Sequence, residues 1–297
     1  MNLTTVAIGE ILWDLFPDNE RLGGATFNFC AHLTRLGAPV HFLSGLGNDG
    51  RGERARSLAR SLTVDTGLVK TVDGPTGTVD VALDSEGKPT FTLRRPAAYD
   101  RISLGENQLA SIAAMEPAWL YYGTLHQIVP EMRELTSRLM ESLVHATRFY
   151  DVNLRPDCYT KELVASLLEG ADVIKLSDEE SVEIDRMFGD HTSTADAFCD
   201  RIARRFEARA VCVTRGARGC VLWHMGAFTE APGYSIKVAD TVGSGDAFAA
   251  GLLWGLAHGW DIRHTADFAN RLGAVVASKA GAVPEWSMAE VEALRHA

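Results

Sequence analysis

A glycine-rich stretch near the C-terminal end of the chain has the residue types of an anion-binding site. It reads Asp240-Thr-Val-Gly-Ser-Gly-Asp-Ala-Phe-Ala-Ala-Gly251 and opens a long apolar segment of helical character. N–H groups at a helix start lack intrahelical acceptors and lie at the positive end of the helix dipole. We therefore expect the N–H groups of residues 243–246 to face one anion, with the Asp246 carboxylate beside it.

Phosphoryl transfer to a hydroxyl group needs donors for the developing charge and a base for the proton. The stretch predicts that Gly243, Ser244 and Gly245 supply the donors and that Asp246 is the catalytic base. A plain glycine turn followed by an ordinary first-turn acid explains the same residues equally well, since acids favour helix N-termini.

A second group of polar residues lies near the N-terminus. Asp14 is a charge inside an apolar run, Gly23 and Gly24 permit close approach of the backbone, and Asn28 falls one turn into the next helix. A carboxylate, backbone N–H groups and an amide are suitable partners for vicinal hydroxyl groups. The alternative is an outward-facing aspartate on an edge strand and a simple turn.

A third group follows an apolar run that contains Lys175. Ser177 and Glu180 have the S-x-x-E spacing of a helix capping box, which is the stronger interpretation of this pair. A carboxylate close to a metal-bound water is the functional alternative.

Short β-branched and apolar runs alternate with helical patterns along most of the chain. This alternation predicts a doubly wound α/β fold with a mainly parallel sheet, helices on both faces and right-handed crossovers. The expected strands are Thr5–Ile8, Val40–Ser44, Trp119–Tyr122, Phe149–Val152, Val173–Leu176 and Val211–Thr214. The expected helices include Phe27–Leu36, Met132–Val144 and Ala195–Phe206.

Two stretches interrupt this alternation. Ile11–Phe16 continues as a strand, and Thr78–Leu83 and Thr90–Leu93 flank a turn at residues 84–87. They predict a small β-sheet lid, formed by about residues 11–25 and 74–97, inserted into a single domain of residues 1–297.

Composition narrows the classes of partner. The 297 residues are 46% apolar and 23% charged, which is typical of a globular protein. The net charge of −10 disfavours nucleic acid as a binding partner. Five scattered cysteines without a C-x-x-C pair fit a reducing compartment. Glu10 and Asp14 interrupt the first apolar run, and no uncharged stretch reaches the length of about 20 residues that spans a membrane. We therefore expect a cytoplasmic protein with no membrane association.

The three groups together resemble the ribokinase-like (PfkB) carbohydrate kinases. The stretch 240–248 is similar to that family's C-terminal signature. Its N-terminal signature resembles the stretch from Gly23-Gly24 through Asn28 to Gly37, together with Gly45-Leu-Gly-Asn-Asp-Gly50. The resemblance covers residues 5–285, and its closest similarity is to fructokinases, on Gly9–Asp14, Ala97–Ile102, Tyr122–Leu125 and Asp151–Arg155.

The resemblance implies roles for individual residues. Asp246 matches the catalytic base and Gly243–Gly245 the anion hole, whereas Asp14, Gly23, Gly24, Asn28 and Arg155 are expected to bind the sugar. The residues expected to bind the nucleotide are Lys175, Thr214, Gly216, Gly219 and Asn270. Glu180 is expected to act on Mg²⁺ through water, although the family has Asn at position 177, and Asp240 and Val242 match a monovalent-cation loop that holds K⁺ in some members.

The implied activity is in-line transfer of the ATP γ-phosphoryl group to a primary sugar hydroxyl, with Mg²⁺ arriving on ATP. Fructose is the expected acceptor, and other PfkB-type sugars or nucleosides remain alternatives. A 2-keto-3-deoxygluconate kinase would need a cation for the substrate carboxylate, for which Arg94, Arg95 and Arg155 are available. The alternative from another class is a non-catalytic sugar or nucleotide sensor. Exposed lid strands also predict a homodimer through the lid.

Overall fold

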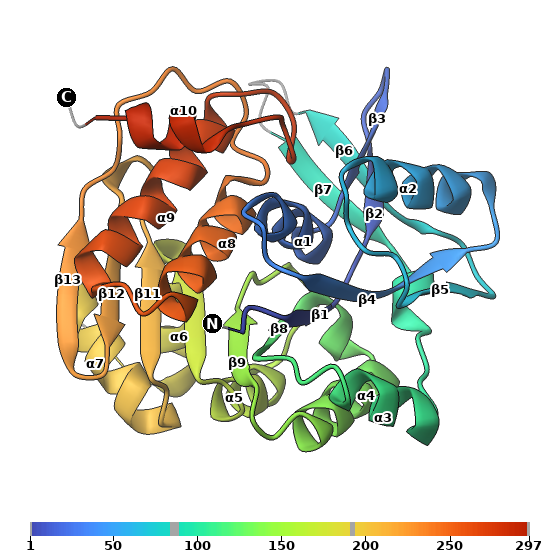
Figure 1. Cartoon of the computed structure of the whole chain (residues 1–297), viewed down its shortest axis with the longest axis horizontal. Coiled ribbons are helices and arrows are strands. Elements are labelled where there is room, and N and C mark those ends of the chain that lie inside the picture. Colours follow the sequence, from blue (N-terminus) through green and yellow to red (C-terminus); the bar gives the residue numbers. More distant parts are fainter. Residues whose placement is uncertain (1, 84–88, 191–193, 296–297) are drawn as a thin grey trace.

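The computed structural model describes residues 2–83, 89–190 and 194–295. Nine strands form the main sheet in the order β13-β12-β11-β10-β9-β8-β1-β4-β5 (Figure 1). All neighbours from β11 to β5 pair in parallel, and β12 and β13 add an antiparallel edge. The strands are β1 Thr5–Ile8, β4 Val40–Gly47, β5 Val69–Val72, β8 Trp119–Gly123, β9 Thr147–Asp151, β10 Val173–Ser177, β11 Ala210–Thr214, β12 Cys220–His224 and β13 Ala227–Ala231. The predicted mainly parallel sheet is confirmed.

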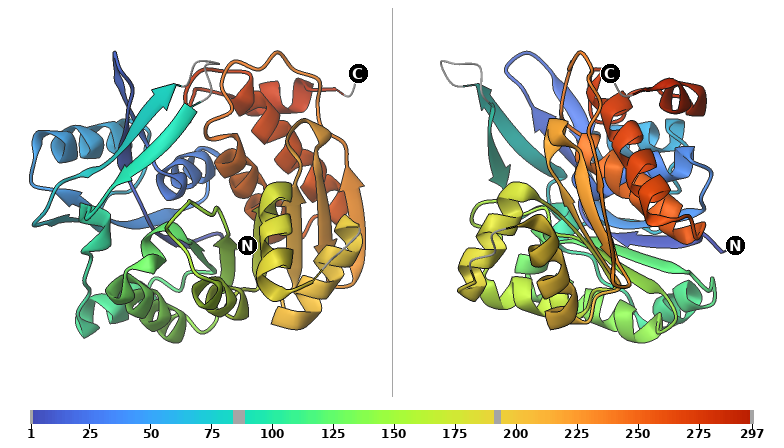
Figure 2. Two further views of the ribbon diagram at one scale, coloured as in Figure 1. Left: turned by 180° about the vertical axis from the view of Figure 1, so that it is seen from behind. Right: turned by 90° about the vertical axis from the view of Figure 1, so that its left-hand side faces the viewer.

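Helices cover both faces of this sheet, as the edge-on view in Figure 2 shows. Successive side chains of a strand point to opposite faces, so Ala7 of β1 joins one apolar cluster while Val6 and Ile8 join the other. The first cluster contains helices from residues 25–61 and 244–293, and the second contains helices from residues 106–206.

The helices are α1 Ala25–Arg35, α2 Gly50–Ser61, α3 Glu106–Ala113, α4 Pro130–Ser142, α5 Lys161–Glu169, α6 Asp178–Phe188, α7 Ala195–Phe206, α8 Ser244–Ala257, α9 Ile262–Ala277 and α10 Met288–Ala293. The three helices with predicted bounds, α1, α4 and α7, begin and end within two residues of them. Among the described residues, none of these helices combines the length and the apolar character needed to cross a bilayer.

A second, four-stranded sheet stands off the main one in the order β3-β2-β6-β7 (Figure 1). Its strands are β2 Leu12–Leu15, β3 Glu20–Gly23, β6 Gly77–Leu83 and β7 Pro89–Arg94. Because β2 lies between β3 and β6, the interpretation of Asp14 as an edge-strand residue is wrong. The turn predicted at residues 84–87 lies outside the described residues.

Candidate active site

Polar residues gather where several parallel strands of the main sheet end. Glu10 follows β1, Asp151 is the last residue of β9, and Lys175 lies in the middle of β10, paired in register with Asp151. The carboxyl ends of parallel strands meet at one edge of a sheet, which is where ligands bind in open α/β folds. Helix α8 begins at the same edge, because a Cβ atom at Gly245 would lie 3.6 Å from Lys175 Nζ.

The start of α8 is shaped by Gly243. This residue has a φ of 80°, and a Cβ atom there would lie 2.1 Å from Ala282 O, so no other residue fits. The Ser244 N–H group, which we expected to face an anion, instead donates to Thr241 O at 3.2 Å. In the described part of the chain the N–H groups of Gly243, Gly245 and Asp246 have no backbone acceptor, so they remain the available donors at this helix start.

Asp246 is joined to a residue 218 positions earlier in the chain. Asn28 Nδ2 donates to Asp246 Oδ2 at 2.8 Å, which leaves the buried Asn28 Oδ1 without a partner in the described part of the chain. Burial raises the pKa of Asp246 to about 7, although the hydrogen bond from Asn28 and the charge of Lys175 act in the opposite direction. A carboxylate with this pKa is a better proton acceptor than an ordinary aspartate, whose pKa is about 4.

A buried ion pair provides the positive charge of the site. Lys175 Nζ donates to Asp151 Oδ1 at 2.9 Å and to Oδ2 at 3.1 Å, and Tyr121 Oη donates to the same carboxylate at 3.0 Å. Burial alone would lower the pKa of Lys175, but the nearby carboxylates of Asp151, Glu180 and Asp246 raise it. The ammonium group therefore stays charged beside the start of α8. Asp151 and Tyr121 were not predicted as site residues.

The carboxylate of Asp14 lies over Gly23, since a Cβ atom at Gly23 would be 2.8 Å from Asp14 Oδ2. Asp14 is opposite Arg21 in the β2–β3 pair. Burial raises the pKa of Asp14 to about 6, and the positive charges of Arg155 and Arg21 limit the rise. The positive charge of Arg155 also opposes the rise of the pKa of Asp246.

Glu10 is a buried carboxylate that sequence reasoning did not assign to the site. It accepts hydrogen bonds from the Thr26 N–H group at 3.3 Å and from Thr26 Oγ1 at 3.2 Å. Gly24, with a φ of 107°, lies against Glu10 O, which a Cβ atom would approach to 2.7 Å. Glu10 thus fixes the start of α1, from which Asn28 projects.

Ser177 and Glu180 form the predicted capping box at the start of α6. Glu180 N–H donates to Ser177 Oγ at 3.2 Å, and Ser177 N–H donates to Glu180 Oε2 at 2.7 Å. Leu154 N–H donates to Glu180 Oε1 at 2.6 Å. Both carboxylate oxygens are thus held by backbone groups, and burial raises the pKa of Glu180.

Apart from Lys175 on β10, the residues expected to bind the nucleotide lie at the end of β11 or after it. Gly219 has a φ of 87°, and a Cβ atom there would lie 2.1 Å from Ala231 O. Asn270 Nδ2 donates to the same carbonyl oxygen at 3.1 Å, so these two residues, far apart in sequence, meet at Ala231. Thr214 ends β11, where its Oγ1 donates to a backbone carbonyl of β10 at 3.3 Å, and Gly216 begins the turn that leads to Gly219.

Asp240 connects the small sheet to the loop before α8. Its Oδ1 accepts from Val242 N–H at 3.1 Å, and its Oδ2 accepts from Gly281 N–H at 3.1 Å and from Arg21 Nη1 at 3.2 Å. A guanidinium group thus supplies positive charge at the carboxylate that the resemblance assigns to a monovalent cation.

The described residues contain no group of three or more His, Cys, Asp or Glu side chains placed to hold a metal ion.

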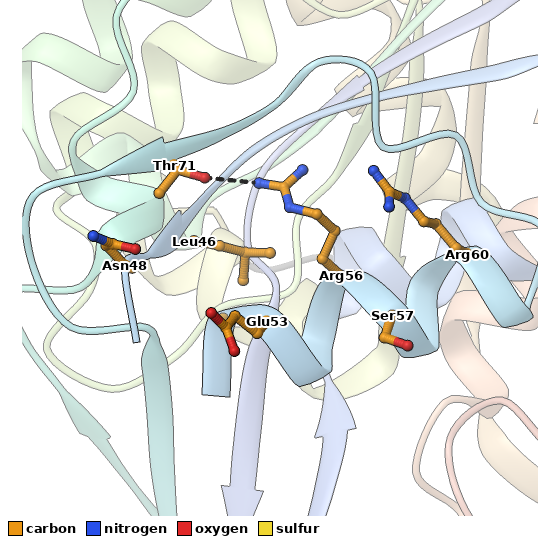
Figure 3. A pocket seen from close by; sticks show the side chains of 9 residues that line it. Leu46, Asn48, Glu53, Arg56, Ser57, Arg60 and Thr71 are labelled. Atoms are coloured by element: carbon orange, nitrogen blue, oxygen red, sulfur yellow. Dashed lines mark hydrogen bonds between the residues drawn. The ribbon is translucent and has the colours of Figure 1, made fainter. Parts of the chain in front are cut away.

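A separate cavity of about 300 Å³ lies between α2 and the ends of β4 and β5 (Figure 3). Arg56 crosses it and donates to Thr71 Oγ1 at 3.1 Å and to Val69 O at 3.0 Å. No predicted site residue lines this cavity.

Known proteins share both the sequence and the fold of this chain. Escherichia coli fructokinase is 30% identical over 95% of the chain and 96% of its own length, and Salmonella typhimurium fructokinase is 34% identical over 86% and 85%. A fructokinase from Xylella fastidiosa solved with bound ATP superposes with a TM-score of 0.84 at 24% identity, covering 95% of this chain and 94% of that one.

A second structural neighbour is 2-dehydro-3-deoxygluconokinase from Thermotoga maritima, with a TM-score of 0.86 at 20% identity and 98% coverage of both chains. At these identities the two solved structures show a common fold and leave the substrate open. The model of the pfkB family carbohydrate kinases matches residues 17–287, which contain both predicted signatures. The chain therefore belongs to the pfkB family of carbohydrate kinases.

Proposed function

We propose that this carbohydrate kinase is a fructokinase, which transfers the γ-phosphoryl group of ATP to the primary ring-distal hydroxyl group of fructose. The observation that carries the chemistry is Asp246, held by Asn28 beside the free N–H groups of α8 and faced by Lys175. A non-catalytic sensor would need no base at this position. The choice of fructose draws on the names of the curated relatives and on the carboxylate of Asp14.

In the proposed reaction the sugar oxygen attacks the γ-phosphorus as its bond to the β-phosphate oxygen breaks. The hydroxyl proton passes to Asp246, and ADP leaves. The N–H groups of Gly245 and Asp246 and the charge of Lys175 stabilise the charge on the transferred group. In a loose transition state the proton leaves late, so a base with a pKa of about 7 is well matched to the step.

Mg²⁺ would supply charge neutralisation on the phosphates and bind mostly through ATP and water. The fixed Glu180 carboxylate fits a contact through water, because both of its oxygens already accept backbone hydrogen bonds. At Asp240, Arg21 already provides a cation, so no step of the proposed reaction uses K⁺.

The small sheet would close over the sugar and exclude water that would otherwise consume ATP. Arg21, on strand β3, supports this role because it reaches the loop that leads into α8. Dimerisation through the same sheet stays a prediction, motivated by its two edge strands, β3 and β7.

Replacing Glu180 by glutamine should raise the Mg²⁺ concentration for half-maximal rate by about tenfold or more, as is typical when a group behind a metal is changed. The glutamine NH₂ group would also face one of the two backbone donors, so some thermal stability should be lost. Ser177→Ala should cost about 1 kcal/mol of stability through the lost cap and leave the Mg²⁺ response unchanged. Magnesium titrations of the initial rate, below the melting temperature of each protein, measure both effects.

The chain offers a matched control. Ser287 and Glu290 form the same capping box at the start of α10. Glu290→Gln should lower the melting temperature without any effect on the magnesium titration. An unchanged titration in Glu180→Gln would reject the metal role and leave only the cap.

The acceptor is tested by kcat/KM with Mg-ATP for fructose, ribose, glucose, adenosine and 2-keto-3-deoxygluconate. We expect fructose to be preferred, and ATP consumption to depend on added sugar. No sugar-dependent consumption with any acceptor would favour the sensor.

The acidic sugar is the second candidate because the charge of Arg155 reaches the predicted sugar site. Arg94 and Arg95 are less available, since they pair with Asp80 at 2.7 Å and Asp100 at 3.4 Å. If 2-keto-3-deoxygluconate exceeds fructose by about tenfold, or 1.4 kcal/mol, the fructose assignment is wrong. Arg155 then becomes the residue to replace.

A further inference from the structure

The loop between α9 and α10 lies directly behind the start of α8. Gly243 is in contact with Ala282 of this loop, because a Cβ atom at Gly243 would lie 2.1 Å from Ala282 O. Gly281 N–H donates to Asp240 Oδ2, on the other side of the same turn. The position of the Ala282 peptide therefore fixes where the donors of Gly245 and Asp246 can lie.

A buried histidine holds that peptide. His32 is fully buried on α1, with its Nε2 3.0 Å from Ala282 O and its Nδ1 3.0 Å from Trp286 Nε1. An indole nitrogen only donates, so His32 Nδ1 is the acceptor and Nε2 carries the hydrogen that is donated to Ala282 O. Burial lowers the pKa of His32 to about 4, which keeps the imidazole neutral and this tautomer intact.

Helix α1 also binds the proposed catalytic base, Asp246 of α8, through Asn28. Asn28 and His32 are four residues apart on α1 and therefore share one face of the helix. Asn28 binds Asp246, and His32 binds the loop behind Gly243. Arg35 adds a hydrogen bond to Pro284 O and places its guanidinium 5.6 Å from the centre of the Trp286 ring.

We infer that His32, oriented by Trp286, is a positioning residue for phosphoryl transfer: it fixes the Ala282 carbonyl against Gly243 and so sets the anion-binding N–H groups relative to Asp246. The inference rests on the proposed function of Asp246 and of the start of α8. On this inference, α1 positions both the base Asp246, through Asn28, and the N–H donors at the start of α8, through His32. His32 itself touches neither substrate.

The test compares His32→Leu, which removes both hydrogen bonds, with His32→Gln, whose amide can donate to Ala282 O and accept from Trp286 Nε1. We expect His32→Leu to lower kcat by about 10²-fold with little change in the KM for sugar, as misplacement of catalytic groups by about 1 Å does. His32→Gln should recover most of this loss. Leu33→Val, which shortens the next buried side chain of α1, should lower the melting temperature but leave kcat close to that of the unaltered protein.

Two further measurements keep the inference testable if His32→Leu folds poorly. Trp286→Phe keeps an aromatic ring but removes the indole donor, and it should lower kcat. In the double variant with His32→Gln the two losses of kcat should not add, because both changes act on the same hydrogen bond. Orthovanadate can adopt the trigonal-bipyramidal geometry of the transferred group when it is held next to ADP. It should therefore tighten Mg-ADP binding to the unaltered protein more than to Trp286→Phe, with Mg-ADP alone bound equally by both. This binding test works even if the acceptor proves not to be a sugar.

The inference is overturned if His32→Leu loses no more activity than Leu33→Val at an equal loss of melting temperature. It is also overturned if His32→Gln is as impaired as His32→Leu. A failed acceptor panel with an intact vanadate effect would instead count against the proposed function and leave the role of His32 standing.

Discussion

Replacing Asp246 by asparagine is expected to lower kcat by roughly 10²–10⁴-fold, the usual contribution of a positioned base. The amide keeps the shape of the side chain and can still pair with Asn28 after rotation, so the fold and the affinity for Mg-ATP should change little. Steady-state kinetics with saturating sugar and ATP, together with calorimetric titration of Mg-ADP, separate the two effects.

A first-turn acid without a catalytic role provides the control. Asp196 occupies the first turn of α7 and is exposed, so Asp196→Asn should leave kcat unchanged. If Asp246→Asn turned over like the unaltered enzyme, Asp246 would be only a helix-capping charge.

The raised pKa of Asp246 also predicts the pH profile. The base must be deprotonated, so kcat/KM should fall as the pH drops through about 7, where Asp246 becomes protonated in the free enzyme. This fall of kcat/KM at acidic pH should disappear in Asp246→Asn. A fall caused by protonation of ATP would instead remain in both proteins.

Replacing Asp14 by alanine should raise the KM for the sugar by about 10²-fold, because hydrogen bonds to a charged group are worth about 1.5–3 kcal/mol each. The KM for ATP should change much less. In the unaltered enzyme the sugar KM should rise below pH 6, since Asp14 has a pKa of about 6 and a protonated carboxyl loses acceptor capacity. Alanine at this position should remove that pH dependence.

Asp80 is the matched control on the neighbouring strand of the same sheet. It pairs with Arg94 at 2.7 Å, so Asp80→Ala disturbs the sheet without touching Asp14. An equal rise of the sugar KM in both variants would mean that Asp14 supports the sheet instead of binding the sugar.

Much of the fold could be predicted from local patterns of apolar and polar residues. Strand β1 and helix α7 have the predicted bounds, because continuous apolar runs and helical periodicity are determined by the residues themselves. The start of α8 was also predicted, from the glycine-rich turn that precedes a long apolar run. The Ser244 N–H group differs because it closes a turn onto Thr241 O, a detail that spacing does not encode.

The missed residues depend on partners that are distant in the chain. Asp151 was missed because it meets the predicted Lys175 only when β9 and β10 pair in this register, although opposite charges in two successive buried strands were a usable signal. His32 has no such signal, since its role depends on Ala282 and Trp286, some 250 residues later. Tertiary contacts of this kind cannot be read from local spacing.

The contact of Asn28 with Asp246 spans 218 residues, and that of His32 with Ala282 spans 250. At about 5–20 residues per second, a ribosome would need roughly 10–45 s to synthesise the stretch between Asn28 and Asp246. Until α8 emerges, the apolar side of α1, which packs with Phe248 and Leu252 in the finished protein, has no cover. The nascent chain therefore lacks a complete active site for most of its synthesis. During this time α1 exposes apolar side chains that are prone to aggregate and that chaperones can bind.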